Sequence, residues 1–556
     1  MNKPTIIFAI IAAAFYLPLQ AQTDLPSEQV EVIKVFEAQL AETEKVPVTP
    51  ELPPIDTTIK RQEYQVPPKS INVDYPAPRI RPITHKSDED IPEVYKFYGK
   101  LGAGLPKAIL GEGAFHTRVE RNDKSSYDIG LNLFHHSADF SSDNVENQRF
   151  GLTKAGGQGT YYFEQGFAVR SKLAYTSNRV SYYGYNFDPF FDRGPLDKDA
   201  VKQLFGIFDF GANIFNGVQT AGDFNYNAGV DFYSMGDQFA ANETGFALNG
   251  KATKWFGGKH SLDIGLITDF TWYNDTLLEK ETLHNFTLHP AFTFHANAIK
   301  VKIGGKVVSH DDEFFPFPDI EAVINLTGNE LAFYVGLEGD LQKNTFRSLT
   351  TYNPYLHTRL EQGTLRNTKY FNAFAGIRGN LKYFEYTAQV GYKPTNDLAL
   401  YIFRFDSDNI YDFDVIYDDV NIVNISGSLK AVPLKNLTVT GTISQSFFDN
   451  TREFRSWHIP SFQANLKAQY VTLDGKLTGK AQLFLENGVP ANRIGGVNRW
   501  DNLGSLYDLS AGGEYWFVKN FGAFLEVNNI LNNKRERWRY YPIYGINVLA
   551  GITARF

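Results

Sequence analysis

Four residues near position 135 have side chains that catalysts use. His135, His136, Ser137 and Asp139 lie close together at the end of a predicted β-strand. Side chains at i and i+2 of a strand share one face, so His135 can stand beside Ser137 as a base beside a nucleophile. The sequence identifies no group that would orient the histidine and no oxyanion donors. We therefore interpret the cluster as a polar strand end that meets a loop, and we predict no catalytic residue.

Acidic residues gather in two predicted loops, and closely spaced oxygen ligands are what Ca²⁺ binds. The two groups are Asp406, Asp408, Asp412, Asp414, Asp418 and Asp419, and then Asp311, Asp312 and Glu313. Neither group has the fixed spacing or the glycine of an EF-hand, so solvated loop charge is the favoured interpretation and no metal site is predicted. The sequence contains no Walker loop, no HExxH motif and no dinucleotide fingerprint, and we expect no cofactor.

The composition of the chain indicates a β-rich protein. Of its 556 residues 15% are aromatic, with 31 Tyr and 46 Phe, and the mean hydropathy is −0.30. After the first 21 residues no window has the ~18 uncharged apolar residues that a membrane-spanning helix needs. The absence of cysteine excludes disulfides, Cys-ligated zinc and Cys nucleophiles. A net charge of −8 without a basic field argues against nucleic acid as a partner.

The first 95 residues differ from the rest. Residues 1–21 predict a signal peptide, because a positive charge precedes an apolar stretch, Thr5–Leu19, and a small residue follows it. Residues 22–95 predict a periplasmic segment without a plug domain. In it a short helix over Ser27–Lys45 precedes a Pro-rich linker, because prolines at this spacing forbid a sheet and favour an extended path.

From Tyr95 onward apolar and polar residues alternate with a period of two, as in Phe462–Tyr470 and Ile546–Ala554. A strand with one apolar and one polar face separates two unlike media. In a transmembrane barrel the apolar face meets lipid and the polar face lines a wet interior. We therefore predict an all-β fold, a transmembrane antiparallel β-barrel of about 22 strands over residues 96–556. An even number of strands places both termini in the periplasm.

The lengths of the predicted connections support a barrel. Short connections at 431–436, 471–476 and 517–520 alternate with long ones at 391–421, 446–460, 487–505 and 531–545. Short periplasmic turns and long outer loops are typical of outer-membrane barrels, whereas a soluble sandwich has no reason to alternate.

Aromatic residues near the predicted strand ends suggest the girdles that sit at membrane interfaces. They are Tyr161, Tyr162, Tyr182, Tyr183, Tyr185, Trp272, Tyr515, Trp516, Trp538, Tyr540 and Tyr541.

The last 36 residues, Phe521–Phe556, read FGAFLEVNNILNNKRERWRYYPIYGINVLAGITARF. They resemble the C-terminal end of TonB-dependent receptor barrels, where a strand, an N-N-[IL]-L-N motif, a Tyr/Trp-rich outer loop and a closing strand ending in Phe follow one another. The segments FEAQLAETEKVPVTPELPPIDTT and YGKLGAG are similar to a plug-less, Bacteroidetes-type group of such barrels. The resemblance implies that Gly551 and Phe556 belong to the signal that the barrel-assembly machinery recognises.

One departure from that family bears on function. A TonB-dependent receptor has a plug of roughly 120–150 residues before its barrel, and residues 22–95 cannot hold one. Because barrels of this size are wide, the lumen should be filled by the N-terminal segment, by inward-folded outer loops or by a partner. Val30, Val32, Ile33 and Val35 are candidates for a periplasmic contact. The run Val30–Val35 resembles a TonB box, and the amphipathic helix is the favoured alternative.

Three functions remain open. The first is a transport conduit or receptor-type barrel of the Gram-negative outer membrane that needs a partner or its own segments to close the lumen. The second is a structural component of an outer-membrane assembly or secretion complex. The third is an outer-membrane hydrolase, although we expect no enzymatic activity. The expected partners are outer-membrane lipid and lipopolysaccharide, the barrel-assembly machinery, and the TonB system, a surface lipoprotein or a secretion complex.

Overall fold

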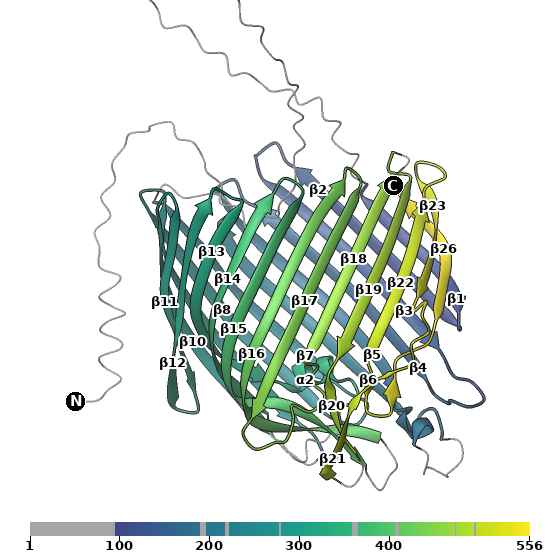
Figure 1. The fold of residues 1–556 in the computed structure, drawn as a ribbon. Helices are drawn as coiled ribbons and strands as arrows, with labels where there is room; N and C mark the ends of the chain where they lie inside the picture. The colour runs from purple at the N-terminus through teal and green to yellow at the C-terminus, as the bar shows by residue number, and fades with distance from the viewer. Residues whose placement is uncertain are drawn as a thin grey trace, which may run out of the picture. The chain divides into compact units, whose positions relative to one another are not determined.

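The computed structural model describes residues 95–188, 196–216, 222–276, 280–358, 365–405, 411–472, 474–493 and 496–556. These residues form one closed antiparallel barrel of 22 strands (Figure 1), which confirms the predicted fold class and strand number. β1 (Phe97–Leu105) pairs with β26 (Asn547–Arg555) and closes the circle. The predicted signal peptide, helix and Pro-rich linker lie outside the described residues.

The other barrel strands follow one another around the wall in chain order. They are β2 (Ala108–Glu120), β3 (Ser126–Asp139), β4 (Arg149–Tyr162), β5 (Phe167–Ser181), β6 (Lys202–Asn216), β7 (Phe224–Gly236), β8 (Asn242–Phe256), β9 (His260–Asn274), β10 (Glu281–His295), β11 (Ile299–His310), β12 (Glu313–Thr327), β13 (Leu331–Asn344), β14 (Arg366–Leu381), β15 (Phe384–Phe405), β16 (Tyr411–Leu434), β17 (Leu437–Asn450), β18 (Phe462–Thr472), β19 (Leu477–Asn487), β22 (Leu506–Tyr515) and β23 (Phe521–Asn528).

Four smaller elements and two helices lie in the connections. They are the hairpins β20 (Val489–Arg493) with β21 (Gly496–Leu503) and β24 (Glu536–Trp538) with β25 (Tyr541–Pro542), the 3-10 helix η1 (Gly184–Phe187) and the helix α2 (Phe346–Tyr352). Among the described residues no helix has the length and apolar character to cross a membrane.

Along β11 the outer face is apolar and the inner face carries charged residues. On β11 the alternate residues Ile299, Ile303 and Val307 leave 43%, 61% and 39% of their side chains exposed, as a lipid-facing surface requires. The intervening Lys302 and Lys306 point inward and form ion pairs with Asp319 of β12 and Asp340 of β13 at 2.6 and 2.7 Å. The alternation that predicts strands in the sequence thus also separates the two faces of the wall.

The two rims of the barrel differ. Phe97 N donates to Phe556 O at 2.9 Å, so β1 begins and β26 ends at the same rim, which we call the terminal rim. Connections there are short, for example 257–259, 382–383 and 435–436. The opposite rim, the loop rim, carries 182–201, 345–365, 451–461, 488–505 and 529–546. The predicted asymmetry of connections is present.

The loop rim also has tight turns, and one corrects a predicted acidic loop. Asp311 and Asp312 are a two-residue hairpin turn with φ of 47° and 61°, and Glu313 begins β12. Two successive positive φ angles define the type I′ turn, which Asn, Asp and Gly favour. The aspartates therefore serve the backbone geometry of a hairpin.

The predicted loop 391–421 is wrong. β15 and β16 pair continuously from Phe384↔Ala431 to Phe405↔Tyr411, apart from one irregularity after Thr395. Strands of 22 and 24 residues exceed the roughly 9–11 residues that a bilayer needs, so their ends project beyond the wall. The many aspartates suggested a loop because Asp is depleted in strands. Here other connections fold onto the projecting hairpin and bury it.

Candidate functional site at the loop rim

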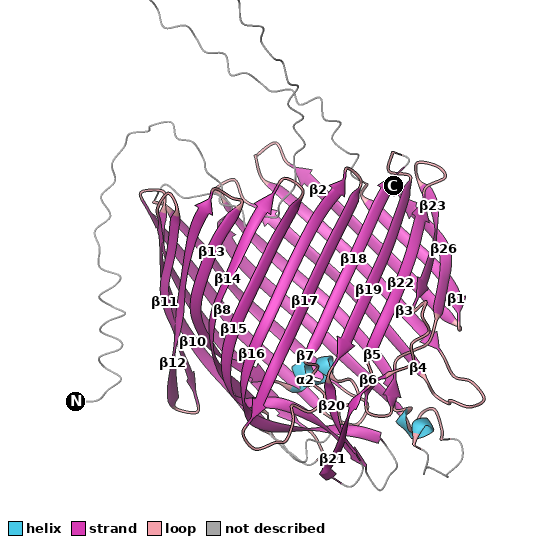
Figure 2. Cartoon of the chain, in the orientation of Figure 1, coloured by secondary structure: helices cyan, strands magenta, loops and turns pink. Residues whose placement is uncertain are grey.

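The connections of the loop rim fold across the mouth of the barrel and pack on one another. Figure 2 shows α2, β20 and β21 gathered at this end, away from the C-terminus. Tyr183, Leu356 and Trp538 are each less than 5% exposed within a single hydrophobic cluster. We call this assembly the mouth cap. It comprises residues 182–188, 345–358, 451–461, 488–493, 496–505 and 529–546 with the projecting ends of β15 and β16.

Tyrosines from three distant connections form the centre of the mouth cap. The rings of Tyr355 and Tyr541 stack with centroids 3.8 Å apart, and Tyr183 packs edge-on against Tyr541 at 5.0 Å. The hydroxyl of Tyr183 donates to the carbonyl of Pro542 at 2.7 Å, and that of Tyr541 donates to the carbonyl of Tyr411. Burial raises the pKa values of the Tyr183, Tyr355 and Tyr541 hydroxyls well above the usual range, so these hydroxyls remain neutral.

His458 joins five segments of the cap and is fully buried. Its Nδ1 donates to the carbonyl of Tyr401 at 2.6 Å, and its backbone N–H donates to that of Pro490 at 2.8 Å. Its ring stacks on Trp538 at 5.5 Å and meets Phe413 edge-on at 4.9 Å. Burial, with two arginines nearby, lowers the pKa of His458 to about 3, so this imidazole is neutral in the closed cap.

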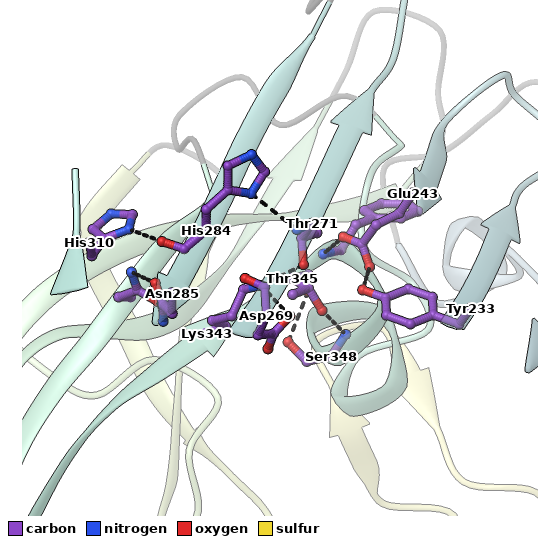
Figure 3. A network of polar contacts seen from close by, with 12 residues as sticks. Tyr233, Glu243, Asp269, Thr271, His284, Asn285, His310, Lys343, Thr345 and Ser348 are labelled. Atoms are coloured by element: carbon purple, nitrogen blue, oxygen red, sulfur yellow. Dashed lines mark hydrogen bonds and ion pairs between the residues drawn. The ribbon is translucent and has the colours of Figure 1, made fainter. Parts of the chain in front are cut away.

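The helix α2 is fastened to the inner wall by a buried carboxylate (Figure 3). Glu243 of β8 accepts the backbone N–H groups of Phe346 and Arg347 at 2.6 and 3.1 Å, and the hydroxyl of Tyr233 at 2.8 Å. Thr345 caps the same helix by accepting the Ser348 N–H at 3.1 Å. A carboxylate at this helix end satisfies N–H groups that have no partner within the helix.

Two cations hold the same connection to the wall. Arg347 forms a bidentate pair with Asp209 of β6, with N···O distances of 2.7 and 3.2 Å. Lys343, at the end of β13, donates to Asp269 at 2.7 Å and to Thr271 at 2.6 Å (Figure 3). The Arg347 pair ties α2 itself to β6, whereas the Lys343 pair joins β9 to the end of β13, from which the chain enters α2.

The aspartates of β16 are structural, which corrects their interpretation as solvated loop charge. Asp412 is fully buried and pairs with His357 of the cap and with Arg404 at 3.2 Å. Asp418 is also fully buried and accepts the backbone N–H groups of Arg452 and Glu453 at 3.0 and 3.1 Å. These carboxylates hold loops against β16, and no group of three or more residues that could ligate a metal occurs in the described part of the chain. Asp406 and Asp408 lie outside it.

The inner wall below the cap is polar and charged. A cavity of about 390 Å³ lies against β17–β19, β22 and β23, with Lys467, Lys480 and Glu526 among its lining residues. Lys100 of β1 forms an ion pair of 2.5 Å with Glu526 and lies 4.1 Å from the ring centre of Phe524. Such a wall can contact hydrated and charged solutes.

The predicted assembly residues lie at the closing seam. Gly551 is paired with Gly102, and a Cβ at position 551 would lie 2.0 Å from the carbonyl oxygen of Leu101. Phe556 packs its ring against Phe97 at 6.2 Å and Phe521 at 5.5 Å. These contacts give Gly551 and Phe556 a role in closure, and their recognition by the assembly machinery stays a prediction. Val30, Val32, Ile33 and Val35 lie outside the described residues.

The structure brings His135 and Ser137 together, as the strand spacing predicts. His135 Nε2 lies 3.0 Å from Ser137 Oγ, and its Nδ1 lies 2.8 Å from the hydroxyl of Thr153 on β4. His136 points to the other face, where its ring meets Phe150 at 5.0 Å. Asp139 accepts the N–H of Ser141 at 3.0 Å and takes no part in this chain of hydrogen bonds.

Sequence reasoning offered inward-folded outer loops as one of three ways to fill the lumen, but it named none of the cap residues and assigned several of the cap aromatics to membrane girdles. Tyr183, Tyr185, Trp538 and Tyr541 are at most 4% exposed and lie in the cap, whereas Tyr515, 45% exposed on the outer face, fits a girdle. The density of aromatic residues in the long connections, such as Trp-Arg-Tyr-Tyr-Pro at 538–542, was the available signal. Solvated loops rarely carry so many large apolar side chains.

No family model matches the chain, and no curated protein matches it. Solved structures do. The pyoverdine outer-membrane receptor FpvA from Pseudomonas aeruginosa PAO1 superposes with a TM-score of 0.62 at 10% identity, over 83% of this chain and 78% of that one. The siderophore receptor PirA from Acinetobacter baumannii gives 0.61 at 10% identity, over 83% and 80%. Identity this low shows the fold alone, a closed β-barrel similar to that of these receptors.

Proposed function

We propose that this chain is a transport conduit or receptor-type barrel of the Gram-negative outer membrane whose mouth is closed by its own loops. One observation carries the proposal. The mouth cap lies across one end of a 22-stranded barrel whose inner wall is polar and charged. A barrel of this size without closure would breach the permeability barrier. A gated mouth over a solute-compatible interior is what a conduit needs.

The proposed orientation in the membrane rests on the difference between the short connections of the terminal rim and the long connections of the loop rim. In this proposal the loop rim faces the cell exterior, near lipopolysaccharide, and both termini are periplasmic. The signal peptide, 1–21, directs export, and the segment 22–95 lies in the periplasm. Its residues Val30, Val32, Ile33 and Val35 contact the TonB system or another periplasmic partner, while a surface lipoprotein is the alternative partner at the loop rim.

Gating can be tested by channel conductance, because the chain has no cysteine and engineered pairs are unambiguous. A Cβ at position 184 would lie 3.0 Å from the Cβ of Tyr411, so Gly184→Cys with Tyr411→Cys needs a small shift to reach the spacing of a disulfide. This pair ties η1 to β16 and so locks these two segments of the cap together. Trp538→Ala removes a ring that packs on His458 and Phe413 and releases the cap.

In planar bilayers we expect the wild-type protein to be mostly closed and Trp538→Ala to give large, frequent openings. Adding the oxidised cysteine pair to Trp538→Ala should remove the openings in which η1 separates from β16, and dithiothreitol should restore them. Each variant must keep the altered gel mobility of an unheated barrel. A folded Trp538→Ala protein that conducts no more than the wild type would contradict gating by the cap.

A sealed scaffold barrel in an assembly or secretion complex is the second candidate. The favouring observation is the tight packing of the cap, where even buried aspartates such as Asp412 and Asp418 have partners. A pull-down of the tagged protein from native envelopes distinguishes the two candidates. Fixed stoichiometry with assembly or secretion proteins, lost on deletion of residues 22–60, would establish the scaffold, whereas recovery alone, with the TonB system or with a surface lipoprotein supports the conduit.

A further inference from the structure

A polar cluster lies on the outward face of β3–β5, where a barrel wall is normally apolar. Ile129, Leu131 and Leu133 of β3 leave 40–63% of their side chains exposed and mark the lipid-facing row. His135 and Ser137 continue this row toward the loop rim, because alternate residues of a strand share a face. The cluster thus stands at the upper end of the apolar band, level with the ester linkages and head groups of lipids.

The hydrogen bonds of the cluster have the order of a catalytic triad. His135 and Thr153 are directly opposite each other on β3 and β4, so register alone places the threonine hydroxyl beside the imidazole. When Nδ1 donates to Thr153 Oγ1 at 2.8 Å, Nε2 is the unprotonated nitrogen and accepts the hydroxyl of Ser137 at 3.0 Å. A nucleophile, a base and a group that orients the base are then present on one rigid sheet.

Neighbouring positions leave room for a substrate and supply a positive charge. Ser137 is paired with Gly151, and Gly151 with Arg179 of β5. The Arg179 guanidinium lies over Gly151, since a Cβ there would be 3.1 Å from its Nη2, and its Nε makes no hydrogen bond within the described structure. The residue directly opposite His135 on β2 is Gly111, which has no side chain, and Ile109, opposite Ser137, is an apolar neighbour of the cluster.

We propose that Ser137, His135 and Thr153 form a lipid-facing hydrolytic site for fatty-acyl esters of membrane lipids. Ser137 Oγ adds to the ester carbonyl as its proton passes to His135 Nε2. The bond from the acyl carbon to the lipid alcohol breaks, and the alcohol leaves with that proton. Water then adds to the acyl-serine carbonyl and gives a proton to Nε2. The bond from the acyl carbon to Oγ breaks, Ser137 recovers the proton, and a fatty acid leaves.

The other residues have supporting roles. Thr153 is a positioning residue that holds the imidazole in the tautomer with a free Nε2. The Arg179 guanidinium stands in the row next to Ser137, where it can stabilise the oxyanion that forms on the carbonyl oxygen. Exposed Leu131 and Leu133 lie below the site and can contact the acyl chain. Because the cluster faces away from the lumen, this activity does not depend on transport through the barrel.

The test labels the full-length, folded protein in detergent micelles with a fluorophosphonate–biotin probe, which reacts with activated serines. We expect an adduct on Ser137, found by peptide mass spectrometry, and its formation should slow roughly 100-fold in His135→Ala. Thr153→Val should slow labelling by roughly tenfold or more, and Thr153→Asn, which keeps a polar partner for Nδ1, should restore much of the rate. Ser171→Ala, an exposed serine on the outward row of β5, is the matched control.

Two lipid substrates identify the source of the ester. Release of fatty acid from a diacyl phospholipid in mixed micelles, or from the ester-linked chains of lipid A, assigns the substrate, and either release should be lost in Ser137→Ala. The gel shift of the unheated barrel confirms that each variant is folded. A folded wild-type protein without an adduct on Ser137, labelling equally fast in His135→Ala, or hydrolysis of neither lipid would overturn the proposal.

Discussion

Acid should open the mouth cap through His458. The imidazole is fully buried among Tyr401, Phe413 and Trp538 and is neutral in the closed cap, because burial lowers its pKa to about 3. In an opened cap it would regain an ordinary pKa of about 6.5. A group that binds a proton only in the open form favours that form as pH falls below 6.5. The contribution of neutral His458 to the stability of the closed cap is complete above pH 6.5 and decreases progressively down to about pH 3.

The magnitude follows from these two pKa values. At pH 7.5 protonation of His458 favours opening by less than about 0.1 kcal/mol, and at pH 5 by about 2 kcal/mol. The open population should therefore increase about 30-fold between these conditions. Glu536 works in the opposite direction, because burial raises its pKa and its protonation at lower pH stabilises the closed cap. A variant that removes only the histidine titration is needed to separate the two.

Hydrogen exchange with mass spectrometry measures the effect directly. After correction for the intrinsic pH dependence of exchange, segments 451–461 and 536–542 should lose protection at pH 5, while the strands of the wall should not. His458→Gln should remove this pH dependence, although the cap is less stable at both pH values. His116→Gln, an exposed histidine on β2, should behave like the wild type. Equal loss of protection at pH 5 in His458→Gln and in the wild type would refute the reasoning.

Two further substitutions test the anchor of α2 and the seam. Glu243→Gln should weaken docking of α2 by about 1–3 kcal/mol, because a neutral amide is a poorer acceptor for the N–H groups of Phe346 and Arg347. Faster hydrogen exchange at residues 346–352 measures this weakening, and unchanged exchange would contradict the anchor. Gly551→Ala should impair barrel closure, since its Cβ would lie 2.0 Å from a backbone oxygen. Gly479→Ala, whose Cβ would lie 4.0 Å from the nearest atom, should fold normally. The gel shift of the unheated barrel reports the folding of both variants, and equal folding would refute the steric argument.

The wall of the barrel was predictable because its cause is local. The alternation of apolar and polar residues indicates which face of the wall each side chain occupies, and the number of strands follows from counting the alternating segments. The cap was not predictable in the same way. Asp418 looks like a solvated loop residue until the chain near Arg452 folds onto it, some 34 positions away. Its partners come from another connection, and no period in the sequence records them.

The triad on the outer face shows the same limit of prediction from sequence, here for only three residues. The pairing of His135 with Ser137 is visible in the sequence because it depends only on the two-residue repeat of a strand. Thr153 could not be found, because its place opposite His135 depends on the register between β3 and β4. That register is determined by the connection 140–148 and by the neighbouring strands. The missing orienting group was therefore one of the two reasons for predicting no catalytic residue; the other was the lack of identifiable oxyanion donors.

The construction of the mouth cap decides how it can open. Opening the whole cap at once would expose its aromatic cluster and break the ion pair of Arg347 with Asp209 of the wall. Each connection, however, has its own root in the barrel, so one connection can leave while the others remain packed. Moving only β24–β25 withdraws Trp538 and Tyr541 and leaves α2 held by Glu243. A partner that acts on a single connection therefore needs much less free energy than one that displaces the entire cap.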